Sequence, residues 1–193
     1  MKTQLFAASL LIAATSAQFA NAAAAPDGTI NFTGNISGAT CQIAVNNGSA
    51  QTAGSSNTSV VTLPNITTSN MNVVGTTKGD TALNIKLSAC TPGSGTAPAQ
   101  ARVYFQSGAG VASDGTLINT ATSGAASGIA LELFDSAGIL IIPGTSTQGT
   151  SVAFPTTGSS TVTLPFTVKY VSTSTAPVAG AYSGSVTYSM SYN

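Results

Sequence analysis

Apolar and polar residues alternate one by one along several stretches of the chain. In the longest internal run, residues 161–171, every second position is apolar: Val162, Leu164, Phe166, Val168 and Tyr170. Residues 81–90 repeat the pattern with Leu83, Ile85 and Leu87. A period of two is typical of a β-strand with one buried face and one solvated face. The two stretches therefore predict strands whose apolar faces meet in a core.

Shorter runs of the same kind predict further strands, with turn-forming residues between them. These strands are expected over residues 42–45, 59–66, 101–106, 117–118, 128–134, 139–142, 152–154 and 181–192. Pro64 confines the second of them to a sheet edge or a crossing point, because proline has no N–H to donate. Many short strands joined by Gly- and Ser-rich turns predict an all-β sandwich.

The stretch 28–36 alternates as cleanly as the internal strands, but its apolar face contains glycine. Every second position is either apolar or a glycine, which has no side chain: Gly28, Ile30, Phe32, Gly34 and Ile36. Glycine weakens a strand and is favoured where another backbone or a bulky side chain must come close. We interpret the stretch as a strand meant for a groove in another molecule. The alternative is an ordinary first strand that pairs within its own domain.

The last predicted strand keeps an apolar row up to the penultimate residue. The row consists of Val186, Tyr188, Met190 and Tyr192. Chain ends are usually frayed and polar, so this strand is expected to be docked along its whole length. Tyr182, Tyr188 and Tyr192 could instead form a platform for stacking carbohydrate, but their spacing along one strand favours core or groove positions.

The N-terminus has the features of a secretory signal peptide. Lys2 provides the positive charge, residues 5–14 form the apolar run, and residues 20–22 read Ala-Asn-Ala, an A-x-A cleavage site. The apolar run is shorter than the roughly 20 residues that cross a bilayer. The sequence therefore predicts a signal peptide over residues 1–22, an N-terminal extension over 23–37 and one β-domain over 38–193.

Two cysteines, Cys41 and Cys90, occur in this exported chain. They most simply form one disulfide, because exported proteins mature in oxidising compartments. The alternative is a pair of free thiols that act as a nucleophile or as metal ligands. That alternative is disfavoured, because the chain contains no histidine to act as a base or as a further metal ligand.

The composition is unusual for its low charge. Only 5% of the residues are charged and the net charge is +0, whereas 42% are hydrophobic. Typical soluble domains carry roughly 25% charged residues. A neutral, hydroxyl-rich surface does not attract nucleic acid and does not repel copies of itself. Disorder is disfavoured, because the alternating apolar runs can build a core.

Few side chains suggest catalysis. Glu132 with Asp135, or Asp80 with Asp114, would be candidates for glycoside hydrolysis, which needs two facing carboxylates. The first pair spans a predicted strand end and its turn, and the second lies in predicted loops, so both favour solvated surface charges. We expect no enzyme activity, no cofactor and no metal ion.

In combination, these features resemble the subunits of chaperone–usher pili, especially type 1-like fimbrial shaft subunits. The matching features span nearly the whole chain: the signal peptide, the stretch 28–36 followed by Cys41, the strand that ends at Cys90, Gly180, and the penultimate aromatic residue Tyr192.

The resemblance implies an incomplete immunoglobulin-like β-sandwich that lacks its last strand and is completed by a donor strand from a neighbouring subunit. The implied donor residues are Gly28, Ile30, Phe32, Gly34 and Ile36. The implied acceptor groove, which also contacts a periplasmic chaperone, includes Gly180, Val186, Tyr188, Met190 and Tyr192. The chaperone would deliver the subunit to an outer-membrane usher, and the resulting polymer would be a surface fimbria that supports cell adhesion.

A minor tip-adaptor or adhesive subunit of the same kind of pilus is the alternative. An adhesin of this family would carry an additional N-terminal lectin domain and no donor segment, which favours a shaft or adaptor subunit here. A third possibility, a secreted hydrolase, is not supported by any residues in the sequence. The sequence identifies no host receptor.

Overall fold

The computed structural model describes residues 40–46, 51–52, 59–92, 98–146, 148, 151–155 and 161–193. The regular structure in these ranges consists of β-strands, and none of them contains a helix that could cross a membrane. The strands are β1 Thr40–Val45, β2 Gln51–Thr52, β3 Thr77–Thr91, β4 Gln100–Phe105, β5 Ile129–Asp135, β6 Leu140–Ile141, β7 Val152–Ala153, β8 Val162–Ser172 and β9 Tyr188–Tyr192.

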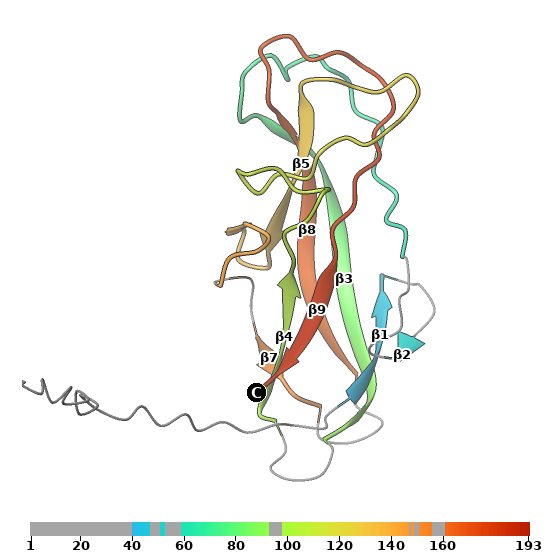
Figure 1. Cartoon of the computed structure of the whole chain (residues 1–193), viewed down its shortest axis with the longest axis vertical. Coiled ribbons are helices and arrows are strands. Elements are labelled where there is room, and N and C mark those ends of the chain that lie inside the picture. The colour runs from blue at the N-terminus through green and yellow to red at the C-terminus, as the bar shows by residue number, and fades with distance from the viewer. Residues whose placement is uncertain are drawn as a thin grey trace, which may run out of the picture. The chain divides into compact units, whose positions relative to one another are not determined.

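The strands form two antiparallel sheets (Figure 1). The larger sheet has the order β2-β1-β3-β8-β5-β6, and the smaller has the order β7-β4-β9. In the view of Figure 1, β9 is drawn between β4 and the strands β3 and β1. The predicted all-β sandwich is confirmed.

The core lies between the two sheets. Every second residue of β3, β8 and β4 points into it, as the alternation predicts: Leu83, Ile85, Leu87, Leu164, Phe166, Val168, Ala101, Val103 and Phe105 are all buried. Phe105 of the smaller sheet meets Phe166 of the larger one edge to face, with ring centroids 5.2 Å apart. Burying one large apolar side chain contributes about 1.5–3 kcal/mol, so these rows are the main source of the sandwich's stability.

The disulfide between Cys41 and Cys90 is confirmed, and the free-thiol alternative is wrong. It joins β1 to β3 with a sequence separation of 49 residues. Both cysteines are buried at one end of the β1–β3 ladder, where the register shifts between Thr40 and Gln42. The bond fixes the first described strand to the neighbouring strand of the larger sheet.

The edge of β4 that faces away from β9 is paired at both of its ends. At the start of the strand, β7 pairs with Gln100 and Ala101. At its end, the side chain of Gln148 takes the place of a strand: Oε1 accepts from the Phe105 N–H at 2.7 Å, and Nε2 donates to the Phe105 carbonyl at 2.8 Å. Gln148 is only 2% exposed, which is rare for a glutamine without good partners. Both ends of this edge of the smaller sheet are therefore occupied.

Residues 59–66 are not a strand, so that prediction is wrong. Their side chains do alternate, because Val61 and Leu63 pack against the core while Val60 is 84% exposed. The side chains alternate as they do in a strand, but the backbone does not pair with any of the described strands. Pro64 contributes to this, because it removes one N–H from the middle of the segment.

Two further boundaries differ from the expected ones. β3 begins at Thr77, before the predicted residue 81, because Thr77 and Lys78 already pair with Val171 and Tyr170 of β8. Gly79 there has φ +72 and lies under the Tyr170 ring, which comes within 2.9 Å of the place a Cβ would take. β2 lies inside a stretch that the sequence predicts as loop.

Residues 181–187 and 117–118 are also predicted as strand by the sequence, and the structure shows that they are not. β9 begins only at Tyr188, and Leu117 forms single bridges with Val111 and Leu131. Hydrogen bonds nonetheless hold both segments in place, and some of them join residues 181–187 to the loop that follows residue 118. The predicted signal peptide and N-terminal extension lie outside the described residues.

Candidate functional site

One edge of β9 has no strand beside it in the described part of the chain. The strand is last in the order β7-β4-β9 and pairs with β4 alone. Hydrogen bonds flank this ladder: Asn193 and Gln100 exchange two backbone bonds of 3.0 and 2.8 Å, and the Gln106 N–H donates to the Thr187 carbonyl at 2.8 Å. Alternate residues of an antiparallel strand bond to the same neighbour. The odd-numbered residues of β9 therefore direct their N–H and C=O groups toward β4.

The even-numbered residues of β9, namely Tyr188, Met190 and Tyr192, consequently direct their N–H and C=O groups to the opposite edge. The same residues turn their side chains toward the core, and Val186 continues the row. Edge strands of this kind are templates for pairing with another chain. We call the main-chain edge together with this row of side chains the free edge of β9.

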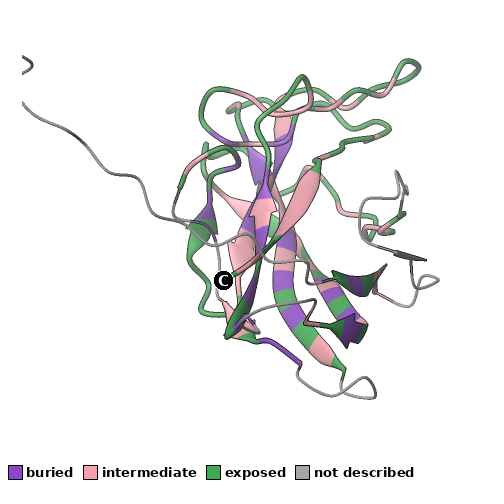
Figure 2. Ribbon diagram, turned by 60° about the horizontal axis from the view of Figure 1, so that its bottom comes forward, coloured by how far each residue is buried: buried purple, intermediate pink, exposed green. Residues whose placement is uncertain are grey.

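The side chains of the free edge are half-buried, although they pack against the core. The β4 residues opposite them are fully buried, with Val103 and Phe105 each 1% exposed. Figure 2 shows the same contrast between the intermediate class along β9 and the buried class on neighbouring strands. The core is thus covered from the β4 side and open at the free edge. Val61 and Leu63 are also only partly buried against the same core.

Tyr192 combines an apolar environment with a polar end. Its ring meets Phe154 edge to face with centroids 5.6 Å apart. Burial raises the pKa of the Tyr192 hydroxyl, and the neighbouring Tyr188 adds to the shift. Within the described residues this buried hydroxyl has no hydrogen-bond partner. A buried hydroxyl without a partner is costly, so this group reduces the stability that the buried ring contributes.

The structure brings together four of the five residues predicted for the acceptor groove and places the fifth elsewhere. Val186, Tyr188, Met190 and Tyr192 form the single row described above. Gly180 lies against a different segment, where a Cβ would meet the backbone of residues 124–126. The predicted donor residues Gly28, Ile30, Phe32, Gly34 and Ile36 lie outside the described residues.

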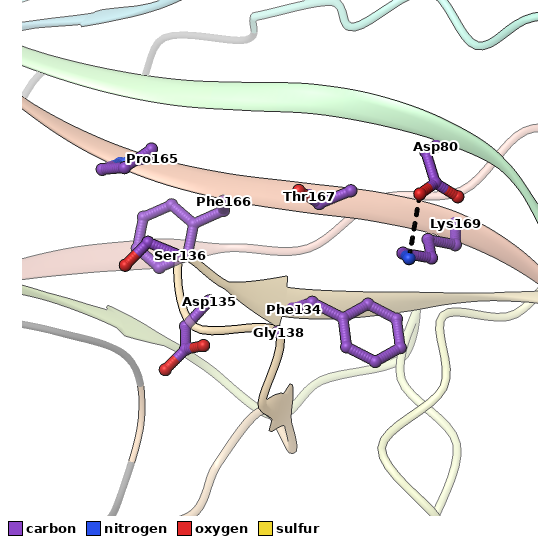
Figure 3. A pocket seen from close by; sticks show the side chains of 9 residues that line it. All are labelled: Asp80, Phe134, Asp135, Ser136, Gly138, Pro165, Phe166, Thr167 and Lys169. Carbon is purple, nitrogen blue, oxygen red and sulfur yellow. Dashed lines mark ion pairs between the residues drawn. The ribbon is translucent and has the colours of Figure 1, made fainter.

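A shallow hollow lies on the outer face of the larger sheet (Figure 3). Lys169 lines it, with Nζ 2.9 Å from a carboxylate oxygen of Asp80 and 5.1 Å from the centroid of the Phe134 ring. The ammonium group is therefore held by a carboxylate and an aromatic face at once. The charged groups of Lys169 and Asp80 in the hollow are thus already paired with each other. None of the residues that line the hollow belongs to the free edge.

The other carboxylates also have structural surroundings. Asp114 accepts from the N–H and the hydroxyl of Thr116 at 2.9 and 2.8 Å, and these bonds lower its pKa. Asp135 Oδ1 accepts from two N–H groups of the turn that follows β5. Burial raises the pKa of Glu132, and the charge of Asp114 raises it further. These environments fit the interpretation of surface and turn carboxylates.

Comparison with known proteins identifies the family. The model of the family described as fimbrial protein matches residues 30–193. The chain belongs to this family. It is therefore a fimbrial subunit, a component of a surface pilus.

Relatives of this fimbrial subunit match over nearly their whole length. It is 31% identical over 193 residues to long polar fimbria protein A of Salmonella typhimurium strain LT2, a match that covers 100% of this chain and 97% of that protein. Among solved structures, the P pilus rod subunit PapA aligns with a TM-score of 0.55 and 17% identity, over 79% of this chain and 99% of the other. A chain from a chaperone–usher pilus aligns with a TM-score of 0.52 and 14% identity, over 87% and 96%. These two likenesses show a shared immunoglobulin-like fold.

Two side chains that hold the smaller sheet and the segment before β9 could not be recognised from the sequence. Asn119 lies in a stretch rich in Gly, Ser and Ala, where a single asparagine reads as a turn residue. Gln148 lies between short predicted strands in a similar context. Both bind main-chain groups of distant residues, and only the fold brings these groups near.

Proposed function

We propose that this fimbrial subunit polymerises by donor-strand exchange. The donor segment, residues 28–36 of one copy, would pair with the free edge of β9 in the next copy. We further propose that a periplasmic chaperone holds the free edge until an outer-membrane usher receives the subunit, and that the resulting fimbria supports cell adhesion. The role is structural, with no reaction catalysed. The observation that carries the proposal is an otherwise closed core that is open along one unpaired strand.

The donor segment and the free edge have matching patterns. Both present apolar side chains at every second residue, so one strand added in phase would pair its backbone and bury its apolar face at once. Immunoglobulin-like sandwiches are built from antiparallel sheets, and we therefore infer an antiparallel orientation to β9. The N-terminal part of the donor segment would then lie beside Tyr192.

The gain in free energy comes from completing the core. Ile30, Phe32 and Ile36 would each contribute about 1.5–3 kcal/mol if fully buried. Each main-chain hydrogen bond along the free edge would add about 0.5–1.5 kcal/mol net. Because all these contacts must break together for the donor to leave, dissociation is expected to be very slow.

The free edge also explains the need for a chaperone. An exposed apolar edge strand pairs readily with any other chain, which leads to aggregation. The low charge of this subunit offers little repulsion to prevent such contacts. A partner that occupies the edge by strand addition before assembly would protect the subunit.

Two complementary variants test the proposal. Phe32→Asp places a charge on the inward face of the donor segment and leaves the free edge intact. Met190→Asp damages the free edge and leaves the donor segment intact. Each is expressed with its signal peptide in cells that have the matching chaperone and usher but lack the wild-type subunit.

Neither variant alone is expected to give fibres by electron microscopy, and a mixture of both should give a heterodimer that does not extend. The matched controls place the same charge on outward faces, Asn31→Asp in the donor segment and Ser191→Asp in β9, and should give normal fibres. Fibres from either inward variant alone would refute donor-strand exchange at this edge.

A further inference from the structure

The donor segment is longer than β9. Nine residues of strand extend about 27 Å from the first Cα to the last, whereas the five residues of β9 extend about 14 Å. Roughly half of the donor would therefore lie beside the residues that precede β9. Tyr182 and Val186 continue the even-numbered row of the free edge there, and both pack against the core. How residues 181–187 are held thus decides how much of a donor the subunit can bind.

Residues 181–187 are not strand, yet they are held in place by the loop of residues 117–126. The Asn119 side chain is the centre of this contact. Its Nδ2 donates to the carbonyls of Ala126 and Ala181, both at 2.9 Å. Its Oδ1 accepts from the N–H groups of Ala121 and Ser183 at 3.1 and 3.0 Å. All four bonds of one amide are used, and two of them reach the segment before β9.

Neighbouring contacts fix the same segment. The Ser183 carbonyl accepts from the N–H and the hydroxyl of Thr120 at 2.7 and 3.0 Å. The Tyr182 hydroxyl donates to the Leu117 carbonyl at 2.5 Å. These bonds hold the Tyr182 ring against the core, where it meets Tyr170 edge to face at 5.6 Å between centroids.

The close approach depends on Gly180. A Cβ there would lie 2.5 Å from the Ala126 nitrogen and against the Gly124 carbonyl oxygen. The backbones bond at the same point, because the Ala181 N–H donates to Gly124 at 2.7 Å and Ala126 donates to Ala181 at 2.9 Å. The contact of Gly180 is therefore with the loop, and it brings the segment within reach of Asn119.

We propose that Asn119 is a positioning residue that aligns residues 181–187 with β9 and so extends the free edge to the length of the donor segment. This rests on the proposed function. The bonds of Asn119 fix the backbone at Ala181 and Ser183 before any donor arrives, so the second half of the strand binds an edge that is already in position. With an antiparallel donor, this half contains Gly34 and Ile36.

The test uses peptides of two lengths. The mature chain carries Phe32→Asp, so that its own donor segment cannot compete, and it is refolded with a synthetic peptide of residues 27–37 or of residues 27–33. The rate of peptide dissociation is measured by exchange against a labelled copy. The shorter peptide should contact β9 alone, whereas the longer one should also contact residues 181–187.

Asn119→Ala is expected to accelerate dissociation of the longer peptide about tenfold, because it removes the two hydrogen bonds that reach residues 181–187. Dissociation of the shorter peptide should change less than twofold. Thr120→Val, which removes a single exposed bond to Ser183, should give the same selectivity with about a threefold effect. It keeps the test decisive if the Asn119→Ala variant does not fold.

The control is Asn46→Ala. Asn46 also holds a backbone group with its side chain, the Asn84 N–H at 2.7 Å, but on the larger sheet. It should affect both peptides equally. Equal effects of the Asn119 and Thr120 variants on the two peptides would overturn the positioning role. Failure of the proposed function would look different, because neither peptide would then bind the chain with an intact Asn119.

Discussion

Replacing Gln148 with alanine should uncover the end of β4 that this side chain occupies, on the edge away from β9. The side chain makes three hydrogen bonds, to the Phe105 N–H at 2.7 Å, the Phe105 carbonyl at 2.8 Å and the Thr145 carbonyl at 2.9 Å. At about 0.5–1.5 kcal/mol net each, their loss amounts to about 1.5–4.5 kcal/mol. The Phe105 carbonyl keeps its bond from Gly144, but the buried Phe105 N–H would lose its partner. We expect a loss of about 3 kcal/mol.

The assay is urea unfolding of the mature Phe32→Asp chain bound to the peptide of residues 27–37, followed by tyrosine fluorescence. Gln106→Ala is the matched control, because Gln106 is exposed directly after β4 and should change the stability by less than about 0.5 kcal/mol. A loss below about 1 kcal/mol for the Gln148 variant would refute the view that this side chain replaces a strand.

A second consequence of the same substitution concerns association. With Gln148 removed, the end of β4 would offer unpaired backbone groups on the side away from β9. The variant should therefore form oligomers even when its free edge is occupied by peptide. Sedimentation would detect them, and a purely monomeric complex would show that Gln148 does not protect this edge.

Four further outcomes are expected. Deleting residues 23–36 should leave a subunit that binds its chaperone but cannot join a pilus, and polymerisation of the deleted chain would refute the donor assignment. Gly34→Leu should slow donor insertion at least tenfold by competition kinetics if a close backbone approach is needed there, whereas Thr33→Leu on the outward face should not. Replacing Cys41 and Cys90 with serine should cost about 4 kcal/mol in urea unfolding, the loop-closure value for 49 residues, and unchanged stability would contradict it. Burial raises the pKa of Tyr182 above its ordinary value, so the stability that its neutral hydroxyl contributes is complete at neutral pH and is lost as the pH rises above about 10. Tyr182→Phe should therefore flatten the alkaline decline in the free energy of unfolding, and an unaltered pH dependence would contradict the burial of this hydroxyl.

The alternation of apolar residues predicted the faces of the long strands well. β3, β8 and β4 bury the predicted rows because their period of two must match a single core. Residues 59–66 alternate in the same way but do not form a strand. Val61 and Leu63 do face the core, but side-chain alternation describes burial and says nothing of whether the backbone has a neighbour to pair with. The prediction of strand over residues 181–187 is wrong for the same reason.

The polar contacts could not be predicted from the sequence. Asn119 and Gln148 bind carbonyl and N–H groups, which every residue has, so no partner is marked by residue type. Gly180 was assigned to the groove because of its place near the C-terminus, and its contact with residues 124–126 depends on how two loops meet. The cysteine pair was predictable, since a chain with two cysteines has only one possible intramolecular disulfide.

The disulfide has a mechanical consequence for a fibre joined as we propose. Tension along the fibre would enter each subunit through the few residues between the donor segment and Thr40, and β1 alone could be peeled from its neighbour one hydrogen bond at a time. Cys41 is the second residue of β1, and its covalent bond to Cys90 passes the load directly to β3, which is paired on both sides. A pulled fibre would therefore shear the interior of its larger sheet all at once, which resists far more force than unzipping an edge.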